Sequence, residues 1–267
     1  MPAPEHITPA QLNRLVGTPD CPVLLDLRTD EDVAAHPALI PTARRVMSSD
    51  VLDEVPGLVG RRVVALCHGG RKISQGAAAL LRSRGIACEV LDGGTERWRA
   101  LPDAQMVPLA THPGRGSVWV TRHRPKIDRI ACPWLIRRFV DPEAVFLFVE
   151  PAEVMAVAER FGATPFDVAD VPFSHRGPGC TLDTMIEVWT LETPALSRLA
   201  TVVRAADTNR HDLAPEAAGL LALSVGLSRQ FKSDLHQLDA GLALYDALYR
   251  WARDGQGEGH DWAPEGK

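Results

Sequence analysis

The chain of 267 residues has no long hydrophobic run, no paired cysteine spacing and no excess of basic charge. Its apolar runs are far shorter than the ~18 residues that a membrane-spanning helix needs, so we expect no membrane partner. The N-terminus lacks the basic segment and apolar core of a signal peptide. Five cysteines without paired spacing are typical of a reducing compartment, and we expect a cytoplasmic protein. The net charge of −5 argues against nucleic acid as a partner.

The length and the 45% hydrophobic content are sufficient for two globular domains. Strand and helix patterns alternate over residues 1–103, which predicts an α/β domain with a parallel sheet and helices on both faces. Residues 104–116 are rich in Pro, Gly and Ala, and we expect a linker there. A mainly helical α+β domain is expected over 117–254, with a flexible tail over 255–267.

Cys67 is the most informative residue, because it ends an apolar strand pattern at 62–66 and precedes a helix pattern that starts near Ser74. A thiol at such a turn lies near unpaired backbone N–H groups and the positive end of a helix dipole, which favour the reactive thiolate. Gly69 and Gly70 allow successive N–H groups to point at one centre, and Arg71 and Lys72 add positive charge. The alternative is an inert cysteine at a buried strand end.

The segment around this loop resembles a rhodanese domain. The resemblance is carried by Asp26 and Arg28, by Glu31, His36 and Ile40-Pro41-Thr42, by the Cys67-x-x-Gly70 loop with Ser74-Gln75, and by Leu91-Asp92-Gly93-Gly94 with Trp98. It implies a sulfurtransferase module that carries sulfur as a persulfide on Cys67 and needs no cofactor. The implied partners are a sulfane-sulfur donor, such as thiosulfate or mercaptopyruvate, and a thiol acceptor.

The resemblance also assigns roles within residues 1–103. The persulfide cradle is expected to consist of His68, Gly69, Gly70, Arg71, Lys72 and Ile73, with Asp26 and Arg28 as supporting residues. Lys72 stands where the family often has arginine. Lysine retains the positive charge but cannot form the two parallel hydrogen bonds of a guanidinium group, and this difference affects which sulfur donor the loop prefers.

A basic cluster opens the second domain. A tetrahedral oxyanion such as chromate would suit its arginine forks. A solvated face with local ion pairs is the alternative, and a nucleic-acid patch is weaker because residues 104–267 hold 17 Lys and Arg against 21 Asp and Glu. The candidate oxyanion residues are Arg122, Arg124, Lys126 and Arg129.

Several His, Asp and Cys side chains in this domain suggest a divalent metal site, although no pair shows a strong ligand spacing. Cap and turn roles are the alternative for each aspartate. A helix is predicted from Pro133 to about residue 140, which would place Cys132 near a positive helix end and make it prone to form a thiolate. The alternative for Cys132 is a small residue packed under Trp134 and Ile130. The candidate metal residues are Asp128, Cys132, His175, Asp183, Asp207 and His211.

Residues 117–253 resemble the C-terminal domain of the chromate-resistance regulator family of the ChrB type. The similar stretches are 119–139, His175-Arg176, Cys180, 206–208, 213–220 and 245–249. The resemblance implies a role in chromate resistance or in the response to chromate. The sequence therefore predicts a sulfurtransferase-like module joined to a domain that binds a metal or an oxyanion. The alternative function is a chromate-responsive regulator in which the rhodanese module is secondary.

Overall fold

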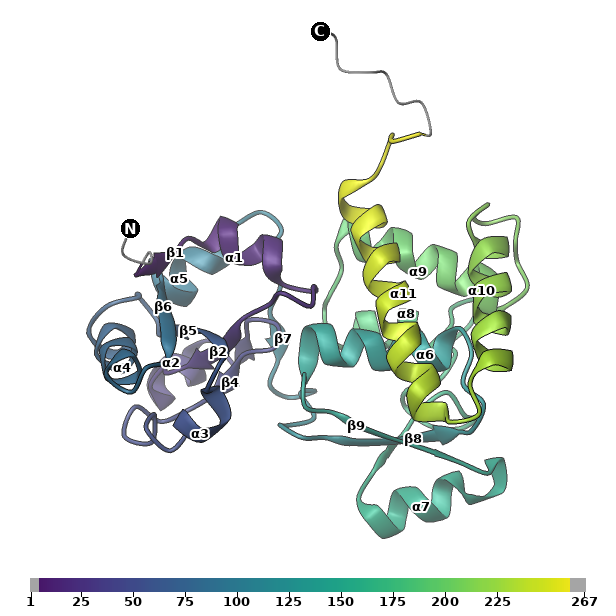
Figure 1. Ribbon diagram of the computed structural model, residues 1–267, viewed down its shortest axis with the longest axis horizontal. Coiled ribbons are helices and arrows are strands. Elements are labelled where there is room, and N and C mark those ends of the chain that lie inside the picture. Colours follow the sequence, from purple (N-terminus) through teal and green to yellow (C-terminus); the bar gives the residue numbers. More distant parts are fainter. Residues whose placement is uncertain (1–4, 260–267) are drawn as a thin grey trace, which may run out of the picture.

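The computed structural model describes residues 5–259, which form two units joined by a packed connecting segment (Figure 1). The first unit is built around a parallel sheet of five strands in the order β1-β6-β5-β2-β4. Its strands are β1 (His6–Ile7), β2 (Val23–Asp26), β4 (Arg44–Arg45), β5 (Arg62–Leu66) and β6 (Ala87–Leu91). Its helices are α1 (Pro9–Leu15), α2 (Asp30–Ala35), α3 (Val55–Leu58), α4 (Lys72–Ser83) and α5 (Gly94–Arg99).

Both faces of this sheet are buried, because alternate residues of its strands point to opposite sides. Val64 of β5 belongs to the core on the side of α1 and α5, which contribute Leu12 and Trp98. Val63 belongs to the core on the other side, with Leu81 of α4. The predicted α/β class with helices on both faces is confirmed.

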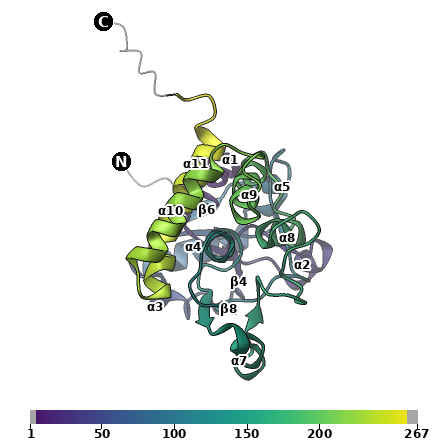
Figure 2. The same ribbon diagram turned by 90° about the vertical axis from the view of Figure 1, so that its right-hand side faces the viewer.

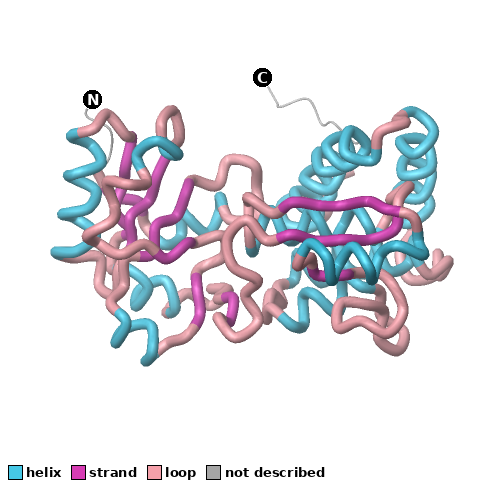
Figure 3. Tube along the Cα trace, turned by 90° about the horizontal axis from the view of Figure 1, so that it is seen from below, coloured by secondary structure: helices cyan, strands magenta, loops and turns pink. Residues whose placement is uncertain are grey.

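The second unit has a small parallel sheet in the order β10-β8-β9, with α7 on one side and the remaining helices on the other (Figures 2 and 3). Val120 of β8 packs with Val154 and Ala158 of α7, whereas Trp119 faces the helical core. The strands are β8 (Val118–Arg122), β9 (Val145–Val149) and β10 (Thr164–Pro165). The helices are α6 (Asp128–Leu135), the π-helix Ile136–Val140, the 3-10 turn Pro151–Glu153, α7 (Val154–Phe161), α8 (Thr181–Val188), α9 (Pro194–Asp207), α10 (Ala217–Gln230) and α11 (Asp234–Asp254).

The segment 104–116 is packed against both units. Its strand β7 (Val107–Pro108) pairs with β3 (Ala38–Leu39) of the first unit, and Val107 is buried. The side chain of Gln105 donates to the carbonyl of Leu191 in the second unit at 3.3 Å. The backbone N–H of Thr42, a residue with φ +65°, donates to the carbonyl of Phe139 at 3.0 Å. One hydrophobic core continues from the first unit into the second.

The helix expected to begin at Pro133 begins instead at Asp128, so that prediction is wrong. Pro133 lies inside α6, where it cannot donate to the carbonyl one turn earlier. The side chains of Ile130 and Trp134 in α6 are buried, and α6 contacts α11. This packing compensates for the lost hydrogen bond. Within the described residues, no helix is long and apolar enough to cross a membrane. Residues 260–267 of the expected tail lie outside the described residues.

Candidate functional site: the Cys67 loop and an Asp–His cluster

Cys67 directly follows β5, and the loop that it opens ends where α4 begins at Lys72. The residue is 5% exposed, and its Sγ lies 3.2 Å from the hydroxyl oxygen of Ser74. Ser74 is in the first turn of α4, so the sulfur lies beside the N-terminus of a 12-residue helix. The hydroxyl of Ser74 also donates to the carbonyl oxygen of Arg71 at 3.3 Å, and the helix dipole places positive potential beside the sulfur.

Two glycines hold the loop against the turn that follows β6. Gly70 has φ +65°, and a Cβ there would lie 2.5 Å from the carbonyl oxygen of Leu91. Gly94 has φ +60°, and a Cβ there would lie 2.2 Å from the carbonyl oxygen of Cys67. The first turn of α5 also fixes the loop, because the N–H groups of Thr95 and Glu96 donate to the carbonyls of Cys67 and His68, each at 3.0 Å. The carbonyls of Cys67 and His68 are thereby hydrogen-bonded and fixed in place.

The rest of the predicted cradle surrounds the loop entrance. Arg71 and Lys72 are exposed, whereas His68 and Ile73 are half-buried. The two supporting residues lie deeper: Arg28 forms a buried bidentate pair with Asp26, with one N–O distance of 2.6 Å. Arg28 also donates to the carbonyl oxygens of His36 and Ala38. Asp26 and Arg28 therefore hold the chain around β3 and act on the scaffold of the first unit.

In the second unit, the candidate metal residues Asp128, His175 and Asp207 come together. One ligand atom from each lies within 4.8 Å of the other two. The Nε2 atom of His175 lies 3.5 Å from Oδ2 of Asp128 and 3.3 Å from Oδ2 of Asp207. These residues come from α6, a loop and the end of α9, which are far apart in the sequence. Asp128 is buried, whereas His175 is 41% exposed and lies at the surface end of the cluster.

Sequence reasoning missed a fourth member, Asp167. Its Oδ1 lies 3.3 Å from Nε2 of His175 and accepts a hydrogen bond from the hydroxyl of Thr181 at 3.0 Å. Arg122 and Arg129 face its other oxygen at 3.1 and 3.3 Å. The basic cluster was the only signal for a nearby carboxylate, and it did not indicate which one.

Asp128 is held by the start of another helix. Its two carboxylate oxygens accept hydrogen bonds from the backbone N–H groups of Thr181 and Leu182, at 2.6 and 3.1 Å. These groups belong to the first turn of α8, where backbone donors have no partner within the helix. The helix N-terminus thereby stabilises a buried charge and leaves the carboxylate facing His175.

The charges of the cluster shift the protonation of its members. Hydrogen bonding to Asp128 and then to Asp167 raises the pKa of His175 to about 10. Burial, followed by the charges of Asp128 and Asp167, raises the pKa of Asp207 to about 6. The metal-free cluster therefore holds a proton on His175 at neutral pH. A divalent cation at the same place would take over its role of balancing three carboxylates.

The remaining candidate metal residues have other contacts. Asp183 accepts from the N–H of Cys180 at 2.9 Å and pairs with Arg204 at 2.7 Å, so it caps α8. Cys132 is fully buried in the interior of α6, and its Sγ lies 3.6 Å from Asp128. Burial and then the charge of Asp128 raise the pKa of the Cys132 thiol, so the expectation of a thiolate there is wrong. His211 is half-buried and is not part of the described three-residue group.

The four basic residues predicted to bind an oxyanion do not share one open surface. Arg122 and Arg129 face Asp167, and Arg129 also donates to the carbonyl of His123 at 2.9 Å. Arg124 donates to the carbonyl of Ser228 at the end of α10. Lys126 is exposed.

Comparison with known proteins agrees with this division of the chain. Residues 119–252, half of the chain, match the ChrB C-terminal domain, and residues 8–101 match the rhodanese-like domain. The chain belongs to the ChrB C-terminal domain family. The Asp–His cluster lies within the ChrB C-terminal domain, and the Cys67 loop lies within the rhodanese-like domain.

One curated relative is Protein ChrB of Cupriavidus metallidurans, which is 33% identical over 136 residues. The match covers 51% of this chain and 40% of that protein, so the chain spans less than half the length of this relative. Solved structures similar to the rhodanese-like part include a rhodanese-like domain protein from Staphylococcus aureus, with 26% identity, a TM-score of 0.31 and coverage of 35% of this chain and 90% of that one. Another is a thiosulfate sulfurtransferase from Pseudomonas aeruginosa, with 27% identity, a TM-score of 0.30 and coverage of 37% and 18%.

Proposed function

We propose that the rhodanese-like domain is a sulfurtransferase in which Cys67 carries sulfur as a persulfide. The observation that carries this proposal is the place of the Cys67 sulfur, 3.2 Å from the Ser74 hydroxyl at the N-terminus of α4. A thiolate there attacks the outer sulfur of thiosulfate, forming a new S–S bond. The S–S bond of thiosulfate breaks, and sulfite leaves with the electron pair. An acceptor thiolate then attacks the outer sulfur of the persulfide, which releases Cys67 as a thiolate.

The loop supports both steps. The exposed side chains of Arg71 and Lys72, four and five residues after Cys67, attract an anionic donor to the loop. The carbonyls of Cys67 and His68 accept hydrogen bonds from the N–H groups of α5 and are therefore already partnered. This arrangement is preorganised for negative charge on sulfur.

Thiosulfate:cyanide transfer by the full chain tests this function. We expect Cys67→Ala to abolish thiocyanate formation, and mass spectrometry to show one added sulfur atom on the wild-type chain and none on the variant. Cys88→Ala is the matched control, because Cys88 is a buried thiol on β6 outside the loop. Full transfer by Cys67→Ala would overturn the assignment of the nucleophile.

We further propose that the ChrB C-terminal domain binds a divalent metal through Asp128, His175 and Asp207, with Asp167 beside them. Carboxylates with one imidazole suit cations such as Mn²⁺ or Fe²⁺, because oxygen donors predominate. A metal is favoured over an oxyanion because Arg122 and Arg129, which would bind the oxyanion, already form ion pairs with Asp167. A role of the two domains in chromate resistance rests on the family resemblance and is part of this proposal.

Elemental analysis of protein purified without a metal-affinity tag tests the metal site. We expect near-stoichiometric metal in the wild-type chain and a loss of that metal in His175→Ala. His236→Ala is the control, since His236 is exposed on α11 away from the cluster. Equal metal content in both variants would contradict the site. Saturable chromate binding that Arg122→Gln abolishes would favour the regulator instead.

A further inference from the structure

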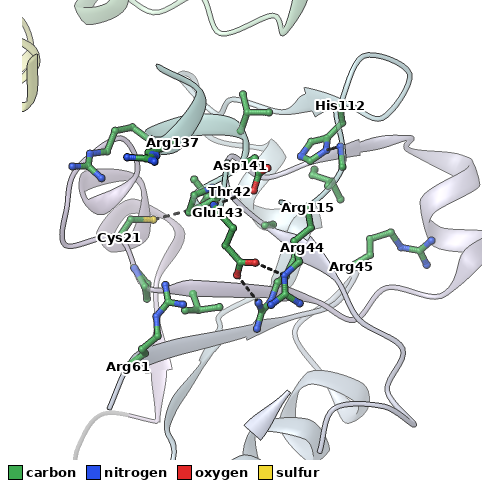
Figure 4. A pocket seen from close by; sticks show the side chains of 18 of the residues that line it. Cys21, Thr42, Arg44, Arg45, Arg61, His112, Arg115, Arg137, Asp141 and Glu143 are labelled. Carbon is green, nitrogen blue, oxygen red and sulfur yellow. Dashed lines mark hydrogen bonds and ion pairs between the residues drawn. The ribbon is translucent and has the colours of Figure 1, made fainter. Parts of the chain in front are cut away.

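A cavity of about 500 Å³ lies where the two units meet the connecting segment (Figure 4). It is separate from the Cys67 loop and from the Asp–His cluster, whose residues do not line it. Arginine is the dominant side chain of its wall. The six arginines are Arg44, Arg45 and Arg61 from the first unit, Arg115 from the connecting segment, and Arg137 and Arg138 from the second unit.

Carboxylates pair with five of these six arginines, and Arg61 is the exception among the described residues. The wall contains two carboxylates, Asp141 and Glu143. Glu143 is shared, since its carboxylate lies 3.2 Å from Arg44 and 2.7 Å from Arg115 (Figure 4). Hydrogen bonding to Arg115 and the charges of the neighbouring arginines keep the pKa of Glu143 below its ordinary value. The acidic partner of Arg138 is Asp246, which is not part of the wall.

Two polar groups of the wall have unmet bonding capacity. Arg44 is paired with Glu54 at 2.6 Å and with Glu143 at 3.2 Å, but its Nε atom is buried without a hydrogen bond in the described structure. Arg61 is exposed to the cavity, and no carboxylate of the described residues lies within ion-pair distance of it. Burial lowers the pKa of Arg44; the charges of Glu54 and Glu143 oppose this shift, and those of Arg115 and Arg61 add to it. An added anion would relieve both the repulsion and the unmet hydrogen bond.

A neutral donor completes the polar wall. The Nδ1 atom of His112 accepts a hydrogen bond from the N–H of Gly114 at 3.0 Å, so the ring proton is on Nε2. Burial lowers the pKa of His112, which keeps the ring neutral. Its Nε2 atom is buried next to the backbone of Val140 and makes no well-aligned hydrogen bond in the described structure.

The remaining wall is apolar and includes Leu39, Leu109 and Val140. The volume is in the ordinary range for small organic ligands and exceeds what one tetrahedral oxyanion fills. A ligand with an apolar body and anionic groups therefore matches the cavity better than a bare inorganic ion.

We propose that this cavity binds a small organic anion whose carboxylate or phosphate groups contact Arg44, Arg61 and Arg115. Its apolar body packs against Leu39, Leu109 and Val140. Because the wall comes from both units, the ligand contacts the rhodanese-like domain and the ChrB C-terminal domain at the same time. The site does not depend on the sulfurtransferase or metal proposals.

Calorimetric titration of the full chain with benzoate, phenyl phosphate and inorganic phosphate tests this site. We expect saturable binding of benzoate or phenyl phosphate, and the one that binds identifies a carboxylate or a phosphate as the anionic group. Arg61→Gln should weaken that binding about tenfold, the loss of one charge-assisted hydrogen bond. Arg62→Gln is the matched control, because Arg62 is exposed on β5, pairs with Glu89 and does not line the cavity.

Three results would overturn the proposal. The first is the absence of saturable binding by benzoate and phenyl phosphate. The second is equal weakening by Arg61→Gln and Arg62→Gln, which would show general surface attraction. The third is inorganic phosphate binding as tightly as the organic anions, since the apolar wall would then contribute nothing.

Discussion

The carboxylate of Asp128 accepts a hydrogen bond from the backbone N–H of Thr181 at 2.6 Å. This hydrogen bond joins the first turns of α6 and α8. This bond connects residues 53 positions apart and directs a buried charge at the Asp–His cluster. The same carboxylate therefore has a structural and a chemical role.

Replacement of Asp128 by alanine should destabilise the protein. The variant leaves the N–H groups of Thr181 and Leu182 buried without partners, at a cost of about 1–3 kcal/mol each. We expect urea denaturation to show a loss of at least about 2 kcal/mol. Asp239→Ala, at an exposed carboxylate on α11, should change stability by less than about 0.5 kcal/mol. Equal losses in the two variants would contradict the role of Asp128.

Affinity for Mn²⁺ should rise with pH. The pKa of His175 is about 10 and that of Asp207 about 6, so near-neutral protein loses the His175 proton when the metal binds. We expect about a tenfold gain in affinity per pH unit between about pH 7 and 8.5, and a steeper fall below about pH 6 as Asp207 also becomes protonated. Calorimetry in two buffers of different ionisation enthalpy measures the released proton. If Mn²⁺ binding were independent of pH and released no proton, the Asp–His cluster would not be the metal site.

Gly70→Ala should disrupt the Cys67 loop. Its φ of +65° and the carbonyl of Leu91 leave no space for a Cβ, so we expect a loss of at least about 2 kcal/mol and loss of sulfur transfer. Gly69→Ala is the control for stability, since the nearest atom to its added Cβ is 3.8 Å away. Thermal unfolding of both variants compares them. A stable Gly70→Ala protein would show that the loop is not held as described.

Two helix glycines should respond in opposite directions. A Cβ at Gly241 of α11 would lie 2.6 Å from Ile130 of α6, so Gly241→Ala is expected to cost about 1–3 kcal/mol through overpacking. Gly226 of α10 has open space, and Gly226→Ala should stabilise by up to about 1 kcal/mol because alanine is the better helix former. Urea midpoints of the two variants measure the difference. Two shifts of the same sign would contradict close packing of α6 on α11.

The α/β class and the position of the Cys67 loop could be predicted because their signals are local. The strand, the glycine-rich turn and the helix that carry Cys67 are contiguous over residues 62–83. The prediction that a helix begins at Pro133 was wrong, because it relied on the local preference of proline for the first turn of a helix and tertiary contacts overrode that preference. In the folded chain, α6 begins at Asp128, whose charge is stabilised by α8.

The metal candidates show the limit of sequence reasoning. Asp128, His175 and Asp207 could be selected as residue types that bind metals, but Cys132, Asp183 and His211 were equally eligible. Only the fold separates them: Asp183 caps α8 and pairs with Arg204, and Cys132 is enclosed inside α6. Asp167 was missed because nothing in its neighbourhood along the chain marks it.

The sequence by itself determined the alternation of strands and helices in the first domain and the strand–loop–helix that carries Cys67, because hydrophobic period and turn residues act between near neighbours. The tertiary structure alone decided which aspartates face His175, where Arg122 and Arg129 point, and that residues from both units enclose an arginine-lined cavity. These features depend on contacts between segments far apart in the chain. Their positions follow from packing and from the pairing of buried charges, which no local pattern records.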